Sequence, residues 1–247
     1  MEGRSRENCR PHVLSNTIPP KDSGKVVKFP DPWLLPDDAD GLIYVGGNLE
    51  IKTLIQAYSL GIYPWPLEEI YPVFWFCPEQ RGILEFSNLH IPRSLQKIIK
   101  KEQFHFTVNK AFPEVIAQCS IQPRPGQEGT WITSSMHKAY LKMHQAGYAH
   151  SIECWKNDQL VGGLYGVFIK GVFSGESMFH LEPNASKLCL IELVSRLKGF
   201  GLTWCDIQMI TPVTKAMGGH YISRRDFLFR LRETRKQPIL TKLPWGR

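Results

Sequence analysis

The sequence lacks a long apolar run. Although 43% of its 247 residues are hydrophobic, no stretch reaches the roughly 20 consecutive apolar residues that a membrane-spanning helix needs. The first residues, MEGRSRENCRPHVLSN, contain arginines but no apolar segment, so they do not resemble a secretory signal peptide. We expect residues 1–27 to form a disordered leader and the protein to be cytoplasmic.

Paired cysteines and common catalytic motifs are also missing. The six cysteines show no C-x-x-C pair and no Cys/His spacing typical of zinc sites; they are Cys9, Cys77, Cys119, Cys154, Cys189 and Cys205. There is no nucleophile elbow, no Ser-His-Asp order and no phosphate-binding glycine loop. We therefore expect neither a metal nor a bound cofactor.

One glycine-containing string allows two interpretations. Arg196, Gly199 and Gly201 match the R-x-x-G-x-G pattern by which acetyltransferases bind the pyrophosphate of coenzyme A. That function requires the glycines at the N-terminus of a helix, where the dipole favours anions. Here they follow a predicted helix, so we interpret them as a C-cap. This position argues against a coenzyme A enzyme.

The net charge of +7 favours a polyanionic partner, although a surface kept soluble by lysine explains a modest excess equally well. The basic residues gather in two clusters interleaved with apolar residues, a pattern typical of amphipathic elements with one solvated face. The first cluster is Arg93, Lys97, Lys100 and Lys101; the second is Arg224, Arg225, Arg230, Arg232, Arg235 and Lys236. Such clusters suit phosphate contacts but name no particular nucleic acid.

The hydrophobic pattern predicts two parts. Turn-forming residues surround a short strand at 42–45, and an amphipathic helix follows before Gly61. We expect a small N-terminal domain at 28–82. Residues 83–247 then alternate between predicted strands (81–86, 105–109, 151–156, 159–169, 171–179, 203–208) and predicted helices (92–101, 110–119, 134–145, 186–199, 212–217, 223–233). The expected class is α+β (α/β-like), with a mixed central sheet flanked by helices.

Three polar residues occupy predicted strands. Alternation places Phe173 on one face of its strand, and Glu176 and Met178 on the other. An isolated buried carboxylate is as often structural as functional. Asp206 and Gln208 share a face of the next strand. They could orient an amine nucleophile and accept its proton through a relay, but their spacing alone favours a structural pair at a strand end.

Aromatic residues beside turns offer another signal. Trp65 in GIYPW and Trp131 in GTWIT could stack on unpaired bases, although tryptophans are more often part of a core. His150 could act as a base, but a lone histidine at the start of a strand is more often structural.

Taken together, ordered motifs resemble the bacterial leucyl/phenylalanyl-tRNA–protein transferases. The matching strings run from about Phe29 to Phe227 and include GLIYVGGNL, GIYPW, LHIPRS, GTWIT, AYLKMHQAGYAHSIECW, LVGGLYGV, GESMF, NASK, DIQ and ISRRDFL. The resemblance implies a small N-terminal domain beside an acetyltransferase-like domain that uses no coenzyme A. It also implies a monomer that transfers leucine or phenylalanine, with methionine as a further donor, from charged tRNA to proteins beginning with Arg or Lys, and so marks them for degradation.

The resemblance assigns roles by motif. Trp65 and Trp131 would contact the terminal adenosine of the tRNA, with Tyr140 nearby. Glu176 would lie near the donor's amino group, and Asp206 and Gln208 would be the catalytic pair. The donor side-chain pocket would draw on Leu164, Phe173, Met178, Leu190, Leu197 and Cys205, which are mostly strongly apolar.

The sequence departs from the family pattern after Gln208. There the chain reads MITPVTKAMGGHYIS, with Thr211 at a position usually held by Asn and Val213 at one usually held by His; Leu197 replaces an aromatic residue. The same reaction with another donor or acceptor is therefore an alternative. A coenzyme A-dependent N-acyltransferase and a non-catalytic tRNA-binding protein are further alternatives. We expect Arg93, Lys97, Lys100 and Lys101 to contact tRNA phosphates.

Overall fold

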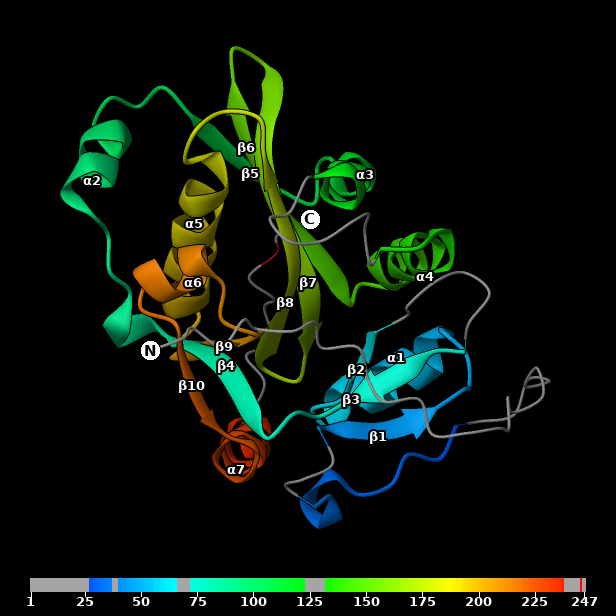
Figure 1. The fold of residues 1–247 in the computed structure, drawn as a ribbon. Helices are drawn as coiled ribbons and strands as arrows, with labels where there is room; N and C mark the ends of the chain where they lie inside the picture. Colours follow the sequence, from blue (N-terminus) through cyan, green and yellow to red (C-terminus); the bar gives the residue numbers. More distant parts are fainter. Residues whose placement is uncertain (1–26, 37–39, 66–71, 123–131, 238–244, 246–247) are drawn as a thin grey trace, which may run out of the picture.

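A seven-stranded mixed sheet forms the centre of the protein (Figure 1). The computed structural model describes residues 27–36, 40–65, 72–122, 132–237 and 245. The strand order is β10-β4-β9-β8-β7-β6-β5, with β4 (Gln80–Glu85), β5 (His105–Val108), β6 (Ala149–Lys156), β7 (Gln159–Ile169), β8 (Val172–His180), β9 (Trp204–Gln208) and β10 (His220–Ser223). A smaller sheet, β1-β3-β2, contains β1 (Leu42–Val45), β2 (Tyr63–Trp65) and β3 (Phe74–Phe76). The mixed sheet confirms the predicted α+β class.

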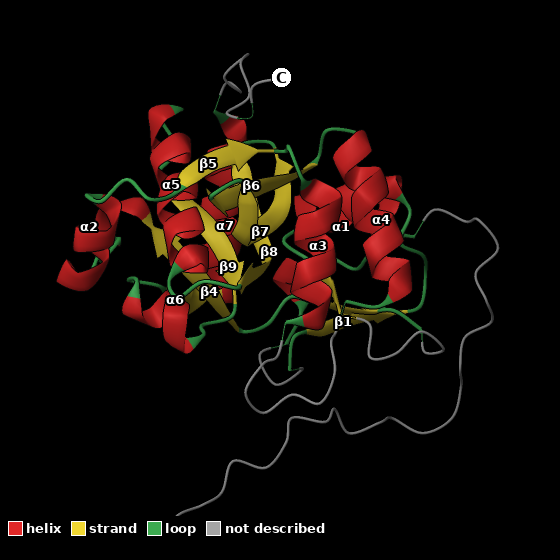
Figure 2. Ribbon diagram, turned by 90° about the horizontal axis from the view of Figure 1, so that it is seen from above, coloured by secondary structure: helices red, strands yellow, loops and turns green. Residues whose placement is uncertain are grey.

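Helices cover both faces of the large sheet (Figure 2). One face carries α1 (Ile51–Ser59), α3 (Phe112–Ile121) and α4 (Ser134–Gln145), while α5 (Ala185–Gly199), α2 (Arg93–Ile99) and α6 (Pro212–Ala216) lie on the other side. The last helix, α7 (Arg224–Lys236), packs against β4, β8 and β10. Two short 3-10 helices, η1 (Pro32–Leu34) and η2 (Phe86–Asn88), complete the described elements. None of the helices in the described part of the chain is long and apolar enough to cross a membrane.

Each face of the large sheet has its own apolar cluster. The first cluster includes Leu54, Trp75 and Tyr140, and so joins the small sheet and α1 to α4. The second lies under α5 and includes Leu164 and Leu193. Because the first cluster continues from the small sheet to the large one, residues 40–65 and 72–76 share buried surface with the rest of the described chain. The domain boundary at residue 82 stays a prediction.

Most predicted elements match their positions in the structure, whereas three short strands were missed. The predictions at 42–45, 134–145 and 159–169 coincide with β1, α4 and β7. The sequence did not reveal β2, β3 and β10, which have three or four residues each and so are too short to show a pattern. In addition, β10 pairs with β4, which is distant in the chain. The glycine string behaves as predicted. Helix α5 ends at Gly199, and Gly201, at a φ of 80°, donates its N–H to the Lys198 carbonyl at 2.9 Å.

Candidate active site

The site lies where β8 and β9, the parallel pair of the sheet, are joined by a single pairing of Ser174 with Asp206. Two residues further along each strand, a hydrogen bond between side chains joins the strands. Gln208 Nε2 donates to Glu176 Oε1 at 2.8 Å. Gln208 has a φ of 57°, a left-handed conformation that departs from strand geometry at the end of β9. The pair therefore bridges the two strands at the point where regular pairing stops.

A β-bulge gives Glu176 its position. In the β7–β8 ladder Gly166 pairs with Gly175 and Tyr165 pairs with Ser177, so Glu176 is the additional residue. The prediction that Phe173 and Met178 lie on opposite faces is therefore wrong, because one extra residue reverses the alternation beyond it. Both side chains belong to the cluster under α5, whereas Glu176 contacts side chains of α1 and α4 on the other face.

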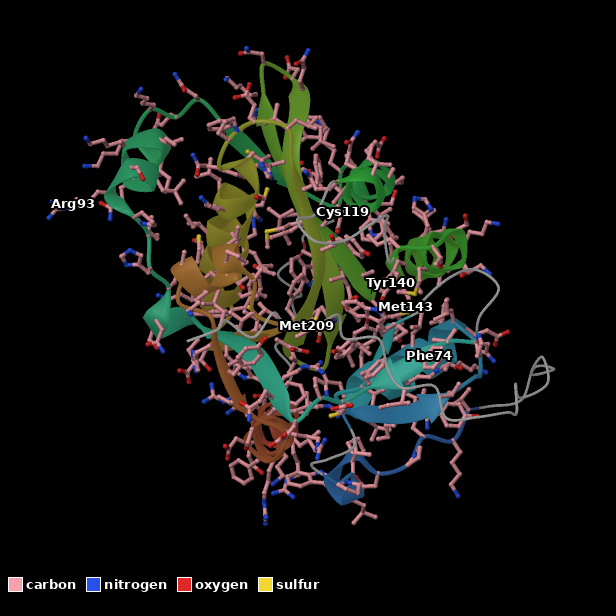
Figure 3. All side chains as sticks on the ribbon, in the orientation of Figure 1. Phe74, Arg93, Cys119, Tyr140, Met143 and Met209 are labelled. Atoms are coloured by element: carbon pink, nitrogen blue, oxygen red, sulfur yellow. The ribbon has the colours of Figure 1, made fainter. Side chains whose placement is uncertain are left out.

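Two tyrosines enclose the Glu176 carboxylate. The Tyr58 hydroxyl of α1 donates to Oε1 at 2.7 Å, and the Tyr140 hydroxyl of α4 donates to Oε2 at 3.0 Å. The two hydroxyl oxygens also lie within hydrogen-bonding distance of each other. Because each hydroxyl has one proton, a bond between them takes the place of one of the two bonds to Glu176. Figure 3 shows Tyr140 between α4 and the sheet. Tyr140 was expected nearby, but Tyr58 was not. Its place on the apolar face of α1, beside Leu54, indicated only a core residue.

Burial dominates the electrostatics of this cluster. It raises the pKa of Glu176 from 4.5 to about 7, although the bonds from Tyr58 and Tyr140 oppose the shift. The same burial, together with the Glu176 charge, raises the pKa of both tyrosines well above 10.0, so each remains a neutral donor. The site thus holds a carboxyl group that changes charge near neutral pH between two hydroxyls that do not.

Asp206 does not contact the side chain of Gln208, which is a correction to the expected relay. Its carboxylate is 1% exposed and receives both Nε and Nη2 of Arg81, at 2.8 and 2.7 Å. It also accepts the Ser174 hydroxyl at 3.1 Å and the backbone N–H of Gln208 at 3.0 Å. A buried carboxylate needs such compensation, and the result is that Asp206 holds the backbone of Gln208 while Glu176 orients its side chain.

Arg81 is a residue that the sequence did not single out. Its guanidinium lies 4.6 Å from the ring centre of Tyr63 and 4.5 Å from that of Phe227, and its side chain is 1% exposed. The ion pair with Asp206 raises the pKa of Arg81, against the opposing effect of burial. One arginine in a short strand gives no signal of such a partner, because the partner is 125 residues away in the chain.

The structure brings the predicted donor-pocket residues together. Within the second apolar cluster they are at most 3% exposed, except for Met178, which is partly buried; the set is Leu164, Phe173, Met178, Leu190, Leu197 and Cys205. Trp245 joins the same cluster, with its ring centre 5.7 Å from that of Phe173 and stacked on His150 at 4.5 Å. Burial lowers the pKa of His150 to about 4, so this histidine is a neutral packing residue.

The other predicted binding residues belong to different elements. Trp65 ends β2 and is half-buried, with its ring centre 6.4 Å from that of Tyr63. Trp131 lies outside the described residues. The α2 cluster (Arg93, Lys97, Lys100 and Lys101) is exposed, and Figure 3 shows Arg93 on the opposite side of the sheet from Tyr140.

The second basic cluster is only partly available to a ligand. Arg224 is 5% exposed and donates to the carbonyl oxygens of Leu35, Pro36 and Cys77. Arg230 pairs with Glu85 at 2.7 Å. These two arginines are therefore engaged within the fold, whereas Arg225 and the basic residues in the C-terminal turns of α7 remain accessible. In the described ranges no group of three or more His, Cys, Asp or Glu residues could hold a metal ion.

Comparisons with known proteins identify the family of this chain. The family model for leucyl/phenylalanyl-tRNA protein transferase matches residues 83–232, and the model for the N-terminal domain of the same family matches residues 47–79. A leucyl/phenylalanyl-tRNA–protein transferase of Shewanella baltica is 42% identical over 85% of this chain and 88% of its own length. One from Hydrogenovibrio crunogenus is 43% identical over 90% and 86%, respectively.

Solved structures are more distant. The structure of L-PGS from Bacillus licheniformis is 13% identical, with a TM-score of 0.39 over 64% of this chain and 51% of that chain. A similarity this low gives no information about function. The sequence relatives and both family models decide the assignment. This chain belongs to the leucyl/phenylalanyl-tRNA–protein transferase family and is an aminoacyltransferase.

Proposed function

We propose that this enzyme moves leucine or phenylalanine, with methionine as a further donor, from charged tRNA to the N-terminal α-amine of proteins that begin with Arg or Lys. The observation that supports this reaction is the Glu176–Gln208 bridge at the end of the β8–β9 pairing, beside an apolar cluster. The basic acceptor residue and the role as a degradation tag rest on the family resemblance. A monomer that works in the cytoplasm, where charged tRNA is made and used, fits the same proposal.

Each of the two bridge residues recognises a different substrate: Glu176 recognises the donor amino acid, and Gln208 recognises the acceptor amine. In its ionised form, Glu176 holds the α-ammonium of the donor amino acid on the α1 face of the sheet. The donor side chain passes between β8 and β9, beyond their single pairing, and reaches the apolar cluster under α5 next to Met178. Gln208 uses Nε2 to bond Glu176, and its Oε1 accepts no hydrogen bond from the described residues. That oxygen is therefore available for an N–H of the acceptor amine. A neutral amide is a poor base, so Gln208 orients the amine rather than deprotonating it.

The reaction itself needs little from the protein beyond position. The acceptor nitrogen attacks the ester carbonyl carbon, a C–N bond forms, and the C–O bond to the terminal ribose breaks. The proton lost by the amine ends on the ribose oxygen that leaves. Because the ester is already activated, holding both substrates in line supplies much of the rate enhancement. Asp206 is a positioning residue in this scheme, since Arg81 neutralises it and it fixes the backbone of Gln208.

We further propose that Trp65 and Trp131 hold the terminal adenosine by stacking. Trp65 supports this assignment by its half-buried position as the last residue of β2, the strand in which Tyr63 contacts Arg81. The α2 cluster would contact phosphates further along the acceptor stem. This arrangement requires the tRNA to reach around the edge of the sheet from the α1 face toward α2.

A transfer assay tests the reaction and both specificities. Purified enzyme is given leucyl-, phenylalanyl- or methionyl-tRNA and peptides that begin with Arg, Lys, Asp or Glu. We expect transfer to Arg and Lys peptides, and a loss of about a hundredfold in kcat/KM for Gln208→Ala. Glu79→Gln, an exposed change outside the site, is the control. Wild-type rates from folded Gln208→Ala would refute the assignment, and transfer to Asp or Glu peptides would refute the proposed acceptor.

A further inference from the structure

A hollow lies away from the Glu176–Gln208 site, and none of the residues of that site lines it. It has a volume of about 290 Å³ and is formed by four segments: η1, the end of α1, the turn between β7 and β8, and the last turns of α7. We call it the α7 hollow. Its floor is apolar, with Leu228 and Leu231, and Trp33 lies on its wall with 41% of its surface exposed.

Cations outnumber anions around the α7 hollow. Lys170, Arg232, Arg235 and Lys236 line it, and the only acidic lining residue is Asp31, whose carboxylate caps the N–H of Trp33 at 3.1 Å. Glu233, outside the lining, pairs with Arg232 and Lys236. Lys170 and Arg235 therefore have no acidic partner in the part of the chain that the structure describes.

Arg235 supplies the most specific evidence. Its Nη1 donates to the carbonyl of Ser59 at the end of α1, but its Nε is buried and has no hydrogen-bond partner within the described ranges. Burial lowers the pKa of Arg235, because no nearby acidic group offsets the water that its charged guanidinium loses. A buried donor left unpaired costs stability, and an oxyanion in the hollow would pair it.

Helix electrostatics alone does not explain this arrangement. Cations in the last turn of a helix complement its dipole, which accounts for Arg235 and Lys236. Lys170, however, belongs to the β7–β8 turn, where its φ of 49° and the φ of 84° at Gly171 fix a tight reversal. This lysine is thus brought to the hollow by a separate element, and the dipole argument does not apply to it.

We propose that the α7 hollow binds the phosphate and part of the ring system of one nucleotide. The unpartnered cations meet the phosphate, while Trp33, with the Arg232 guanidinium 5.5 Å from its ring centre, offers a flat surface for a base. The volume lies near the lower end of the range for small-molecule sites, which fits a single nucleotide. The nucleotide belongs either to the bound tRNA, which rests on the proposed function, or to a free ligand.

Calorimetric titration with adenosine monophosphate tests the hollow itself, without any transfer reaction. The hollow variant is Lys170→Gln/Arg235→Gln, and the control is Lys198→Gln/Arg225→Gln, which removes the same two residue types from exposed positions outside the hollow. We expect wild type and control to bind alike and the hollow variant to bind about tenfold more weakly. No binding by wild type, or equal affinity in all three proteins, would overturn the proposal. The single variant Lys170→Gln, at an exposed turn, gives the same test with a minimal effect on folding.

Transfer kinetics then separate the two sources of the nucleotide. A raised KM for aminoacyl-tRNA in the hollow variant, with the control unchanged, assigns the nucleotide to tRNA. Weakened adenosine monophosphate binding with an unchanged KM assigns it to a free ligand. If no transfer occurs in any protein, the proposed reaction fails, and the titration still decides whether the hollow binds a nucleotide.

Discussion

Replacing Glu176 by glutamine should stabilise the protein at neutral and alkaline pH while impairing transfer. Glutamine has the same shape, and the surrounding bonds can be completed. Its oxygen accepts from Tyr58 and Gln208 as Oε1 does now, and its amide donates to Tyr140, whose hydroxyl turns to Tyr58. The change thus removes a desolvated charge. The second amide N–H gains no partner among these bonds, and its cost does not depend on pH.

The pKa of Glu176 sets the size of the effect. Its rise from 4.5 to about 7 on folding corresponds to about 3 kcal/mol at pH values where the carboxyl is ionised in both states. Because the folded state holds its proton more tightly, this carboxyl costs nothing well below pH 4.5, and its cost grows as the pH rises to about 7. The free energy of unfolding of Glu176→Gln should therefore exceed that of wild type by about 3 kcal/mol more at about pH 8 than at about pH 4.

Guanidinium unfolding followed by tryptophan fluorescence measures this difference, because every other titrating group is shared by the two proteins. Glu79→Gln, an exposed carboxylate lost elsewhere, should show no comparable dependence on pH. In transfer assays wild type should gain activity as Glu176 ionises near pH 7, and Glu176→Gln should lack this rise. A stability difference that stays constant between the two pH extremes would refute the reasoning.

Three further predictions follow from the packing and the charges. Arg81→Leu should lower the free energy of unfolding by about 3–5 kcal/mol, because it leaves Asp206 buried and unpaired. The double variant Arg81→Leu/Asp206→Leu should recover part of that loss. If chemical denaturation shows that the losses of the two single variants simply add in the double variant, the pair does not stabilise the fold. Replacing all four basic residues of the α2 cluster by glutamine should weaken tRNA binding and make its logarithmic salt slope shallower by up to about 3, so an unchanged slope in filter-binding measurements would exclude the cluster. Trp245→Ala should lower the free energy of unfolding by about 3–5 kcal/mol, because Trp245 is 4% exposed. Trp33→Ala should lower the free energy of unfolding by less, because Trp33 is 41% exposed. Equal losses would show that Trp245 is not packed as described.

The sequence by itself determined the class of fold and the motifs of the site. Long elements such as β7, a continuous apolar run, and α4, with a helical hydrophobic period, carry a pattern over ten or more residues, so local pattern sufficed to place them. The glycine C-cap of α5 was likewise readable, because helix termination depends on neighbouring residues. The strings GESMF and DIQ pointed to Glu176 and Gln208 before any geometry was known.

Only the tertiary structure decided how those residues act. The bulge that turns Glu176 toward Tyr58 depends on the register between β7 and β8, and no local signal specifies it. The pairing of Arg81 with Asp206 joins segments far apart in the chain, so the sequence assigned Asp206 to Gln208 instead. Local chemistry therefore fixed which groups are present, while long-range packing fixed which group compensates which charge.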